Sequence, residues 1–224
     1  MPSIYDLQDG SSPTAVPLAK FPSVPHGLAS TYYEGYFQEL VRAAASIDLA
    51  AMDRAANVLL EAHMAGATVF SCGNGGSAAI ANHMQCDHLK GVRTETDLRP
   101  KVLSLSSNVE LLTAVANDLG YEEIFAYQLQ SQSRPGDVLV AISSSGRSPN
   151  IVNAVRWATN HGLRTIALTG FSGGDAKISA EVAVHVDCTN YGVIEDLHQS
   201  VMHALAQYVR QSRMSADVIP LTTF

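Results

Sequence analysis

DVLVAISSSGRSPNIVNAVRWATNHGLRTIALTG, residues 137–170, is the stretch of sequence that predicts the fold. It holds two short apolar runs, 137–143 and 164–170, and between them a segment with helical periodicity at about 148–161. Both runs are continuous rather than alternating, which is typical of strands that are buried on both faces. The stretch therefore predicts two parallel strands joined by a crossover helix.

The same alternation extends outward in both directions. Apolar runs rich in β-formers recur as ATVFSCG, KVLSL and VAVHVD, and helical periodicity recurs at about 78–90, 107–117, 121–132 and 193–213. We therefore predict an α/β fold with a mainly parallel sheet covered by helices on both faces. Two helical segments, in YYEGYFQELVRAAASI and DLAAMDRAANVLLEAHMAG, lead into the first strand, and Gly66 predicts the end of the second.

The length of 224 residues predicts one domain with short appendages. We predict an extended N-terminal arm over residues 1–27, which are rich in proline, serine and glycine. A single domain that includes the lead-in helices follows over 28–213, and a tail over 214–224. The tail is either loose or an arm that lies on a neighbouring subunit.

Charge and hydropathy exclude several classes of function. The net charge of −7 and the isoelectric point of about 5.5 argue against nucleic acid or an anionic membrane as the main partner. No apolar run approaches the ~18 residues of a membrane span, and the N-terminus does not resemble a signal peptide. Cys72, Cys86 and Cys188 form no CxxC pair, which favours reduced thiols. We expect a cytoplasmic protein.

Two loops that follow predicted strands are rich in hydrogen-bond donors. They are CGNGGS, residues 72–77, and SSSGRSPN, residues 143–150. Glycines allow close backbone approach, and a helix that begins after each loop presents free N–H groups to an anion. One such loop is equally well explained as a tight turn with a helix cap, but two after strands of one sheet favour a phosphate site. The candidate binding residues are Asn74, Gly75, Ser77, Ser143, Ser144, Ser145 and Ser148. The first loop is neither a dinucleotide fingerprint nor a Walker A motif, and we expect no nucleotide cofactor.

These loops, together with EDLHQSVMHAL at residues 195–205, resemble the SIS-domain sugar-phosphate isomerases, and among them most closely the phosphoheptose isomerases. The resemblance covers about residues 30–210. It implies a three-layer αβα sandwich with a five-stranded parallel sheet, usually assembled as a homotetramer with active sites between subunits. It also implies a phosphorylated sugar substrate, most closely the interconversion of sedoheptulose 7-phosphate and D-glycero-D-manno-heptose 7-phosphate.

The resemblance also assigns roles to single residues. Ser143, Ser145 and Ser148 match the phosphate-binding serines, Asn74 and Ser77 match positions that line the sugar site, and Asp118 falls on a loop near it. In phosphoheptose isomerases a His and a Glu four apart, and a Gln and a His eight apart, hold zinc and supply the base and the acid. The matching positions here are His83, Asp87, Glu195 and His203. Asp87 replaces the usual Glu and Glu195 the usual Gln.

The chemistry of an aldose–ketose isomerase requires a base, an acid and a group that stabilises an enediolate. We predict Asp87 or Glu195 as the base and His203 as the acid, with zinc or a similar divalent ion at the four matching positions. Because Asp is one methylene shorter than Glu, two alternatives stay open. One is an isomerase of a different sugar phosphate, and the other is a non-catalytic SIS protein that binds a sugar phosphate or a protein partner and regulates.

The remaining histidines are expected to be packed and hydrogen-bonded rather than catalytic. This interpretation is favoured for His63, His88, His161 and His185, each of which lacks a carboxylate at a matching position. His198 shares a helical face with Glu195, and its role as support or ligand is left open.

Overall fold

The structure is a computed structural model and describes residues 20–224, so most of the predicted arm over 1–27 lies outside the described residues. Its centre is a five-stranded sheet in the order β2-β1-β3-β4-β5, and every pair of neighbouring strands is parallel. All five predicted strands are confirmed. Their bounds are Thr68–Gly73 (β1), Lys101–Ser104 (β2), Val138–Ser143 (β3), Arg164–Thr169 (β4) and Val182–His185 (β5).

Helices connect the strands as the periodicity predicts. They are Ala29–Ala44 (α1), Leu49–Ala65 (α2), Gly76–Cys86 (α3), Val109–Asp118 (α4), Ala126–Gln132 (α5), Pro149–Asn160 (α6), Gly174–Ser179 (α7) and Tyr191–Gln211 (α8). The short α7 was not predicted, because six residues that begin at a glycine are too few to show a helical period. Gly66 ends α2 in the left-handed conformation, with φ of 68°.

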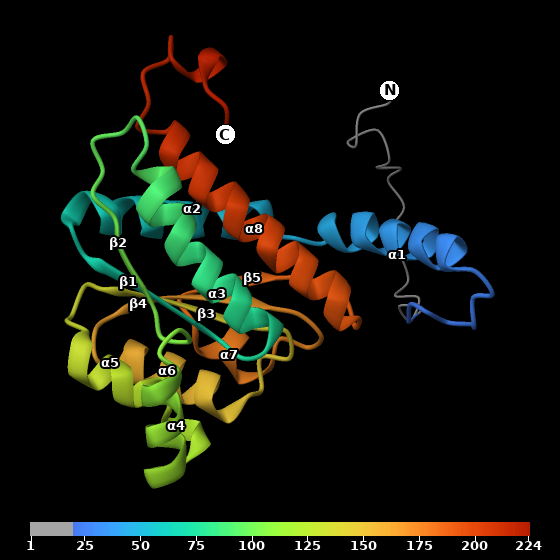
Figure 1. The fold of residues 1–224 in the computed structure, drawn as a ribbon, viewed down its shortest axis with the longest axis horizontal. Helices are drawn as coiled ribbons and strands as arrows, with labels where there is room; N and C mark the ends of the chain where they lie inside the picture. The colour runs from blue at the N-terminus through green and yellow to red at the C-terminus, as the bar shows by residue number, and fades with distance from the viewer. Residues whose placement is uncertain (1–19) are drawn as a thin grey trace.

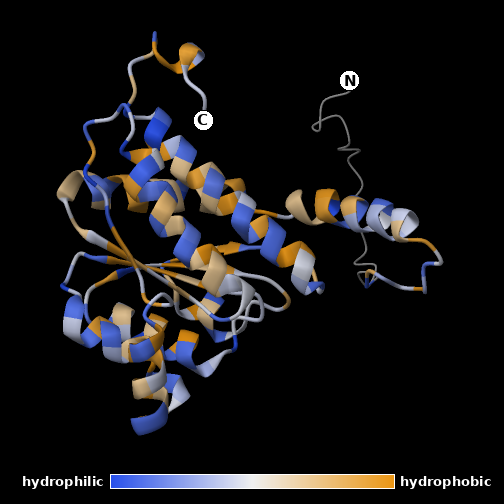
Figure 2. Cartoon of the chain, in the orientation of Figure 1, coloured by the Kyte–Doolittle hydropathy of each residue, from blue (hydrophilic) through white to orange (hydrophobic). Residues whose placement is uncertain are grey.

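Alternate residues of each strand build the two faces of the sheet. In β3, Val138, Val140 and Ile142 pack against α2, α3 and α8, whereas Leu139 and Ala141 pack against α5 and α6. Figure 1 shows the resulting layers, with α2, α3 and α8 on one face and α4 to α7 on the other. The strands between them are mostly apolar in Figure 2. This is the predicted three-layer sandwich.

The lead-in helix α1 extends away from the three layers (Figure 1). It contacts α8, where the Tyr36 hydroxyl donates to Asp196 Oδ2 at 2.6 Å. Tyr33, Phe37 and Val41 recur every four residues on α1 and are 65%, 52% and 52% exposed. The helix therefore carries an apolar stripe that its own chain leaves uncovered.

The C-terminal tail folds back beside the end of α8. Arg210 donates to the carbonyl oxygens of Thr94 and Thr223 and to Glu95, and its guanidinium lies 5.0 Å from the centre of the Phe224 ring. One side chain thus holds the tail against the segment after α3. Thr223 and Phe224 line a hollow of about 470 Å³ that also contains Asp87 and His203.

Among residues 20–224, α8 is the longest helix, with 21 residues, and its buried side chains are mostly apolar. Across residues 20–224, no helix combines the length and the apolar character that crossing a bilayer requires.

Three histidines are buried in the sandwich. His63 Nε2 and His88 Nδ1 lie 2.8 Å apart as a hydrogen-bonded pair, which confirms the packed interpretation for both. Burial lowers the pKa of His63 to about 4 and that of His88 to about 3. His198 is fully buried as well, and burial lowers its pKa to about 4, so it is a neutral core residue at physiological pH.

We expect these histidines to make the fold sensitive to mild acid. Their pKa values are depressed in the folded chain, so the unfolded chain, with a histidine pKa near 6.5, binds more protons below that pH. The free energy of unfolding should therefore fall as the pH drops from 6.5 towards 4, by up to about 1.4 kcal/mol per pH unit for each histidine. Urea titrations at several pH values measure this. A free energy that stays constant between pH 6.5 and 4.5 would contradict it.

Candidate functional site

The two donor-rich loops lie side by side at the carboxyl edge of the sheet. Gly73 at the end of β1 pairs with Ile142 near the end of β3. The chain passes from β1 outward to β2 and then returns to the other side of β1 with β3, so this is the point at which the strand order reverses. Ligands of open α/β sheets bind at such points.

A pair of amides joins the two loops. The Asn74 amide donates to Asn150 Oδ1, and the Asn150 amide donates back to Asn74 Oδ1, both at 2.9 Å. Tyr121 donates its hydroxyl to the same Asn74 oxygen at 3.0 Å. The Asn74 side chain is therefore engaged with protein groups, and it positions the loops relative to each other.

The serine loop between β3 and α6 carries hydroxyls with few protein partners. Ser144 is 5% exposed, and its Oγ has no hydrogen-bond partner among the described residues. Ser148 precedes α6 without capping it through its side chain, and Ser145 Oγ only accepts a long hydrogen bond of 3.3 Å. Buried hydroxyls in this state are costly unless a ligand satisfies them. The loop thus offers hydroxyl donors that the protein itself leaves largely unused.

Gly146 fixes the shape of the serine loop. Its φ is +63°, and a side chain there would overlap the carbonyl oxygen of Gly173 in the neighbouring loop. The Gly146 carbonyl in turn accepts from the Ala176 N–H at 3.0 Å. Only glycine combines this conformation with this close approach.

The glycine turn after β1 faces a carboxylate. A side chain at Gly76 would overlap the Glu195 carboxylate, so α3 begins directly against that group of α8. Burial, and secondarily the charge of Asp196, raises the pKa of Glu195 above its usual range. Ser77, in the first turn of α3, is buried beside this turn. Raising the pKa of a carboxylate makes it a stronger base, which is the direction that removal of a proton from carbon requires.

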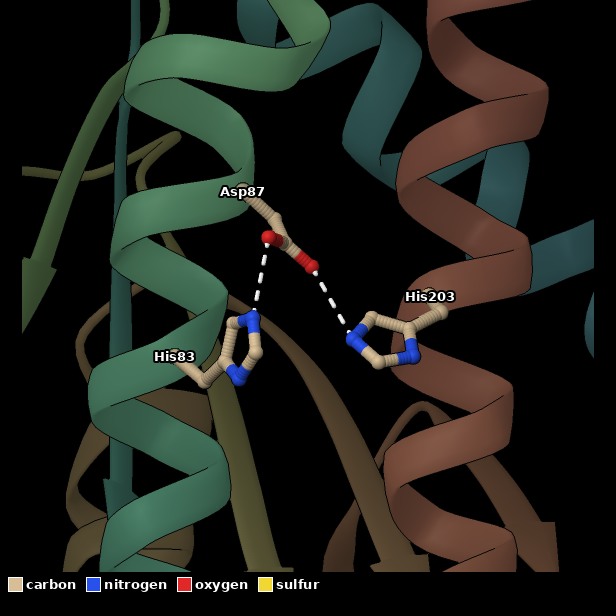
Figure 3. A group of neighbouring side chains, drawn as sticks. All are labelled: His83, Asp87 and His203. Carbon is tan, nitrogen blue, oxygen red and sulfur yellow. Dashed lines mark ion pairs between the residues drawn. The ribbon is translucent and has the colours of Figure 1, made fainter. Parts of the chain in front are cut away.

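The second half of the site is a cluster of His83, Asp87 and His203, shown in Figure 3. His83 Nε2 lies 3.1 Å from Asp87 Oδ1, and His203 Nε2 lies 3.4 Å from Asp87 Oδ2. The two rings are edge-to-face with centres 5.1 Å apart. The side chains of His83 and His203 are 49% and 42% exposed and that of Asp87 25%, so the cluster is open to solvent.

Two helices position the cluster. His83 and Asp87 are one turn apart, and a π-helical turn, Asp87–Val92, begins at Asp87 where α3 ends. Such turns widen a helix locally and are frequent at functional sites. His203 projects from α8, which runs beside α3.

The donor set of this cluster fits a divalent transition metal. One ligand atom from each of the three residues lies within 4.8 Å of the others, and two imidazoles with a carboxylate are ligands that zinc favours. Glu195, the fourth predicted ligand, is not among the three residues that the described chain brings together in this way. Its carboxylate lies instead at the glycine turn.

Some residues occupy positions other than the predicted ones. Asp118 is the last residue of α4 rather than part of a loop, and its carboxylate accepts from the Asn117 amide. The sequence did not single out Asn150, Tyr121 or Gln199 as site residues. Asn150 and Tyr121 contact Asn74 from segments far apart in the sequence, and nothing in their spacing signals those contacts. Gln199 contacts His203 on the same helix four residues away, a spacing that could have signalled the contact.

Comparison with known proteins gives a consistent result. The model of the SIS domain matches residues 32–170. A phosphoheptose isomerase of Akkermansia muciniphila is 40% identical over 164 residues, covering 71% of this chain and 84% of the relative. One from Roseiflexus is 35% identical over 154 residues, covering 69% and 78%. The solved structure of a phosphoheptose isomerase from Neisseria gonorrhoeae superposes with a TM-score of 0.75 at 30% identity, covering 82% of this chain and all of that one.

Proposed function

The chain belongs to the SIS domain family and, within it, to the phosphoheptose isomerases, and on that premise we propose that its two loops and its carboxylates isomerise sedoheptulose 7-phosphate. The reaction is an aldose–ketose isomerisation that yields D-glycero-D-manno-heptose 7-phosphate. The observation that supports this use of the site is the meeting of both donor loops and the Glu195 carboxylate at one edge of the sheet.

The phosphate is assigned to the serine loop. Ser143, Ser144, Ser145 and Ser148 surround the N-terminus of α6, whose free N–H groups and dipole favour a dianion. Ser144 supplies the donor that lacks a protein partner. We assign Ser77 and the backbone of Gly75 to the sugar, with Asn74 holding the loops together. Asp118 is retained as a proposed contact of the sugar.

We assign the proton transfer to Glu195 and His203. Glu195 removes a proton from C1 of the ketose, the electron pair forms the C1–C2 double bond, and the C2 carbonyl becomes an enediolate oxygen. The same proton returns at C2 while His203 exchanges protons with the two oxygens. His83, Asp87 and His203 would hold a divalent ion, which supplies electrostatic stabilisation to the oxygens. With or without the ion, Asp87 orients the imidazole rings of His83 and His203.

The test of the activity is an isomerase assay of the purified protein on a panel of C5–C7 ketose phosphates. Sedoheptulose 7-phosphate should be turned over with the highest kcat/KM. Turnover of none of these substrates would contradict the proposal, and preference for a pentulose phosphate would reassign the substrate.

We expect Ser145→Ala to raise KM for the sugar phosphate by ~10-fold or more, with a smaller effect on kcat. Loss of one donor to a charged acceptor removes about 1.5–3 kcal/mol of binding. Steady-state kinetics measure the change, and Ser131→Ala on the exposed face of α5 is the matched control. An unchanged KM in Ser145→Ala would remove this loop from the site.

We also propose that the protein is a homo-oligomer, most simply a tetramer with sites between subunits. The apolar stripe of Tyr33, Phe37 and Val41 on α1 supports this, because a second copy would remove it from water. Light scattering at micromolar concentration should report an oligomer, and Phe37→Glu should dissociate it. A wild-type monomer would contradict the proposal.

The proposed compartment is the cytoplasm. Cys72, Cys86 and Cys188 are all free thiols, and Cys86 is exposed. Reduced thiols of this kind are typical of a reducing compartment.

A further inference from the structure

The loop that connects β4 to α7, residues 170–173, lies beside both halves of the proposed reaction site. Thr169, at the end of β4, pairs with Ser143 at the end of β3, so this β4–α7 loop leaves the sheet next to the serine loop. β4 also pairs with β5, and the segment after β5 leads into α8. The β4–α7 loop is therefore flanked by the serine loop on one side and by the start of α8 on the other.

Two hydrogen bonds tie the β4–α7 loop to the serine loop. The Gly170 N–H donates to the Ser144 carbonyl oxygen at 2.8 Å. The Arg147 guanidinium donates to Ser172 Oγ, also at 2.8 Å. The close glycine contact between the same two loops adds to these bonds. The position of the serine loop thus depends on that of the β4–α7 loop.

The same loop packs against the first turn of α8. A side chain at Gly170 would overlap the side chain of Ile194, the residue directly before Glu195. The Phe171 ring lies on the ring of Tyr191, the first residue of α8, with the two centres 4.7 Å apart. The start of α8, and with it the Glu195 carboxylate, therefore rests on the β4–α7 loop.

Phe171 has an unfavourable backbone conformation. Its φ is +49°, in the left-handed region that glycine and asparagine adopt more readily. Its N–H donates to the Cys188 carbonyl oxygen at 2.9 Å, which helps to hold this conformation. Its ring packs against the buried cluster that contains Val193, Ile194 and Leu197 of α8. Strained residues of this kind persist where the surrounding structure fixes them, often at binding sites. Because a glycine would fit the backbone better, what phenylalanine contributes here is its ring.

The substrate of an aldose–ketose isomerase gives this spacing a chemical meaning. The phosphate of a ketose phosphate is at one end of the carbon chain and the reacting C1 and C2 are at the other. If the serine loop holds the phosphate and Glu195 removes the proton, the distance between them selects the length of the chain that reacts. Misplacement of a reacting group by ~1 Å can cost ~100-fold in rate, so this distance must be fixed closely.

We propose that Phe171 is a positioning residue that sets the separation of the serine loop from the start of α8, and thereby selects the chain length of the ketose phosphate. The assignment rests on the proposed isomerase function. Phe171 acts through the β4–α7 loop and through Tyr191 rather than on the substrate itself.

The test compares kcat/KM of the full-length protein for sedoheptulose 7-phosphate with that for ribulose 5-phosphate. Phe171→Asn removes the ring but tolerates the positive φ. It should lower the ratio of the two kcat/KM values by ~10-fold or more, mainly through kcat for the seven-carbon sugar, because the reacting carbons are then misplaced. Phe171→Tyr keeps the ring and should keep the wild-type ratio. His161→Asn is the matched control, because it removes a stacked ring at the opposite end of α6 from the serine loop.

Ser172→Ala tests the loop from its other side. Ser172 is exposed, so the change removes the bond to Arg147 without opening a cavity, and it should lower the same ratio by a smaller factor. An equal fall in kcat/KM for both sugars in a folded Phe171→Asn would indicate a merely structural role and overturn the proposal. An unchanged ratio in Phe171→Asn or in Ser172→Ala, or a lowered ratio in Phe171→Tyr, would overturn it as well. A wild type that turns over neither sugar would instead overturn the proposed function, and this assignment with it.

Discussion

His203→Ala is expected to lower kcat for sedoheptulose 7-phosphate by at least ~100-fold and to abolish tight Zn²⁺ binding. The ring supplies the proposed acid at the sugar oxygens, and general acid–base groups typically contribute 10²–10⁴-fold, so a loss of ~100-fold is the lower bound. It is also a member of the cluster with His83 and Asp87. Steady-state assays measure kcat, and a Zn²⁺ titration of the metal-stripped protein in competition with a chromophoric chelator measures the binding.

The fold should survive this change. The His203 side chain is 42% exposed, so its removal opens no buried cavity, and circular dichroism and thermal unfolding should resemble the wild type. His161→Ala is the control, because His161 is an exposed histidine at the end of α6, stacked on Trp157. Wild-type turnover in His203→Ala would remove this residue from the mechanism.

Gly146→Ala is expected to raise KM for the sugar phosphate by more than ~10-fold and to destabilise the fold. The left-handed φ of +63° costs an alanine about 1–2 kcal/mol, and the new methyl group would overlap the Gly173 carbonyl oxygen. The serine loop must therefore shift, which displaces the hydroxyls of Ser144 and Ser145 from a common phosphate. Kinetics and urea unfolding report the two consequences.

Gly66→Ala is a closely matched control for that substitution. Gly66 has a similar φ of +68°, but the nearest atom to an added methyl group is 4.0 Å away. It should lose the same ~1–2 kcal/mol of stability and keep the wild-type KM. Equal KM values in the two variants would show that the contact with Gly173 does not shape the phosphate site.

Much of the fold could be predicted from the sequence because parallel strands that are buried on both faces appear in it as continuous apolar runs. Each of the five runs forms a strand, and the sheet order then places the loops after β1 and β3 next to each other. The short helix α7 was missed because six residues show no period. Tyr121 and Asn150 could not be foreseen, since their contacts with Asn74 depend on tertiary packing.

The site was predictable where a single helix sets the geometry. His83 and Asp87 meet because residues four apart share a helical face, and their spacing signals this directly. The position of the Glu195 carboxylate depends instead on how α8 packs along α3. The sequence placed this residue with the metal ligands, whereas its carboxylate faces the start of α3. Gln199 lies one helical turn before His203, so the same four-residue rule could have signalled their contact.

The reciprocal amide pair of Asn74 and Asn150 has a consequence for how this site can change during evolution or design. Replacing one loop with a sequence that lacks its Asn would leave the other amide without its partner, at a cost of about 1–3 kcal/mol. The sequences of the two loops are therefore expected to change together. New sugar preferences are best sought at positions around the pair, such as Tyr121, or by exchanging both loops in a single step.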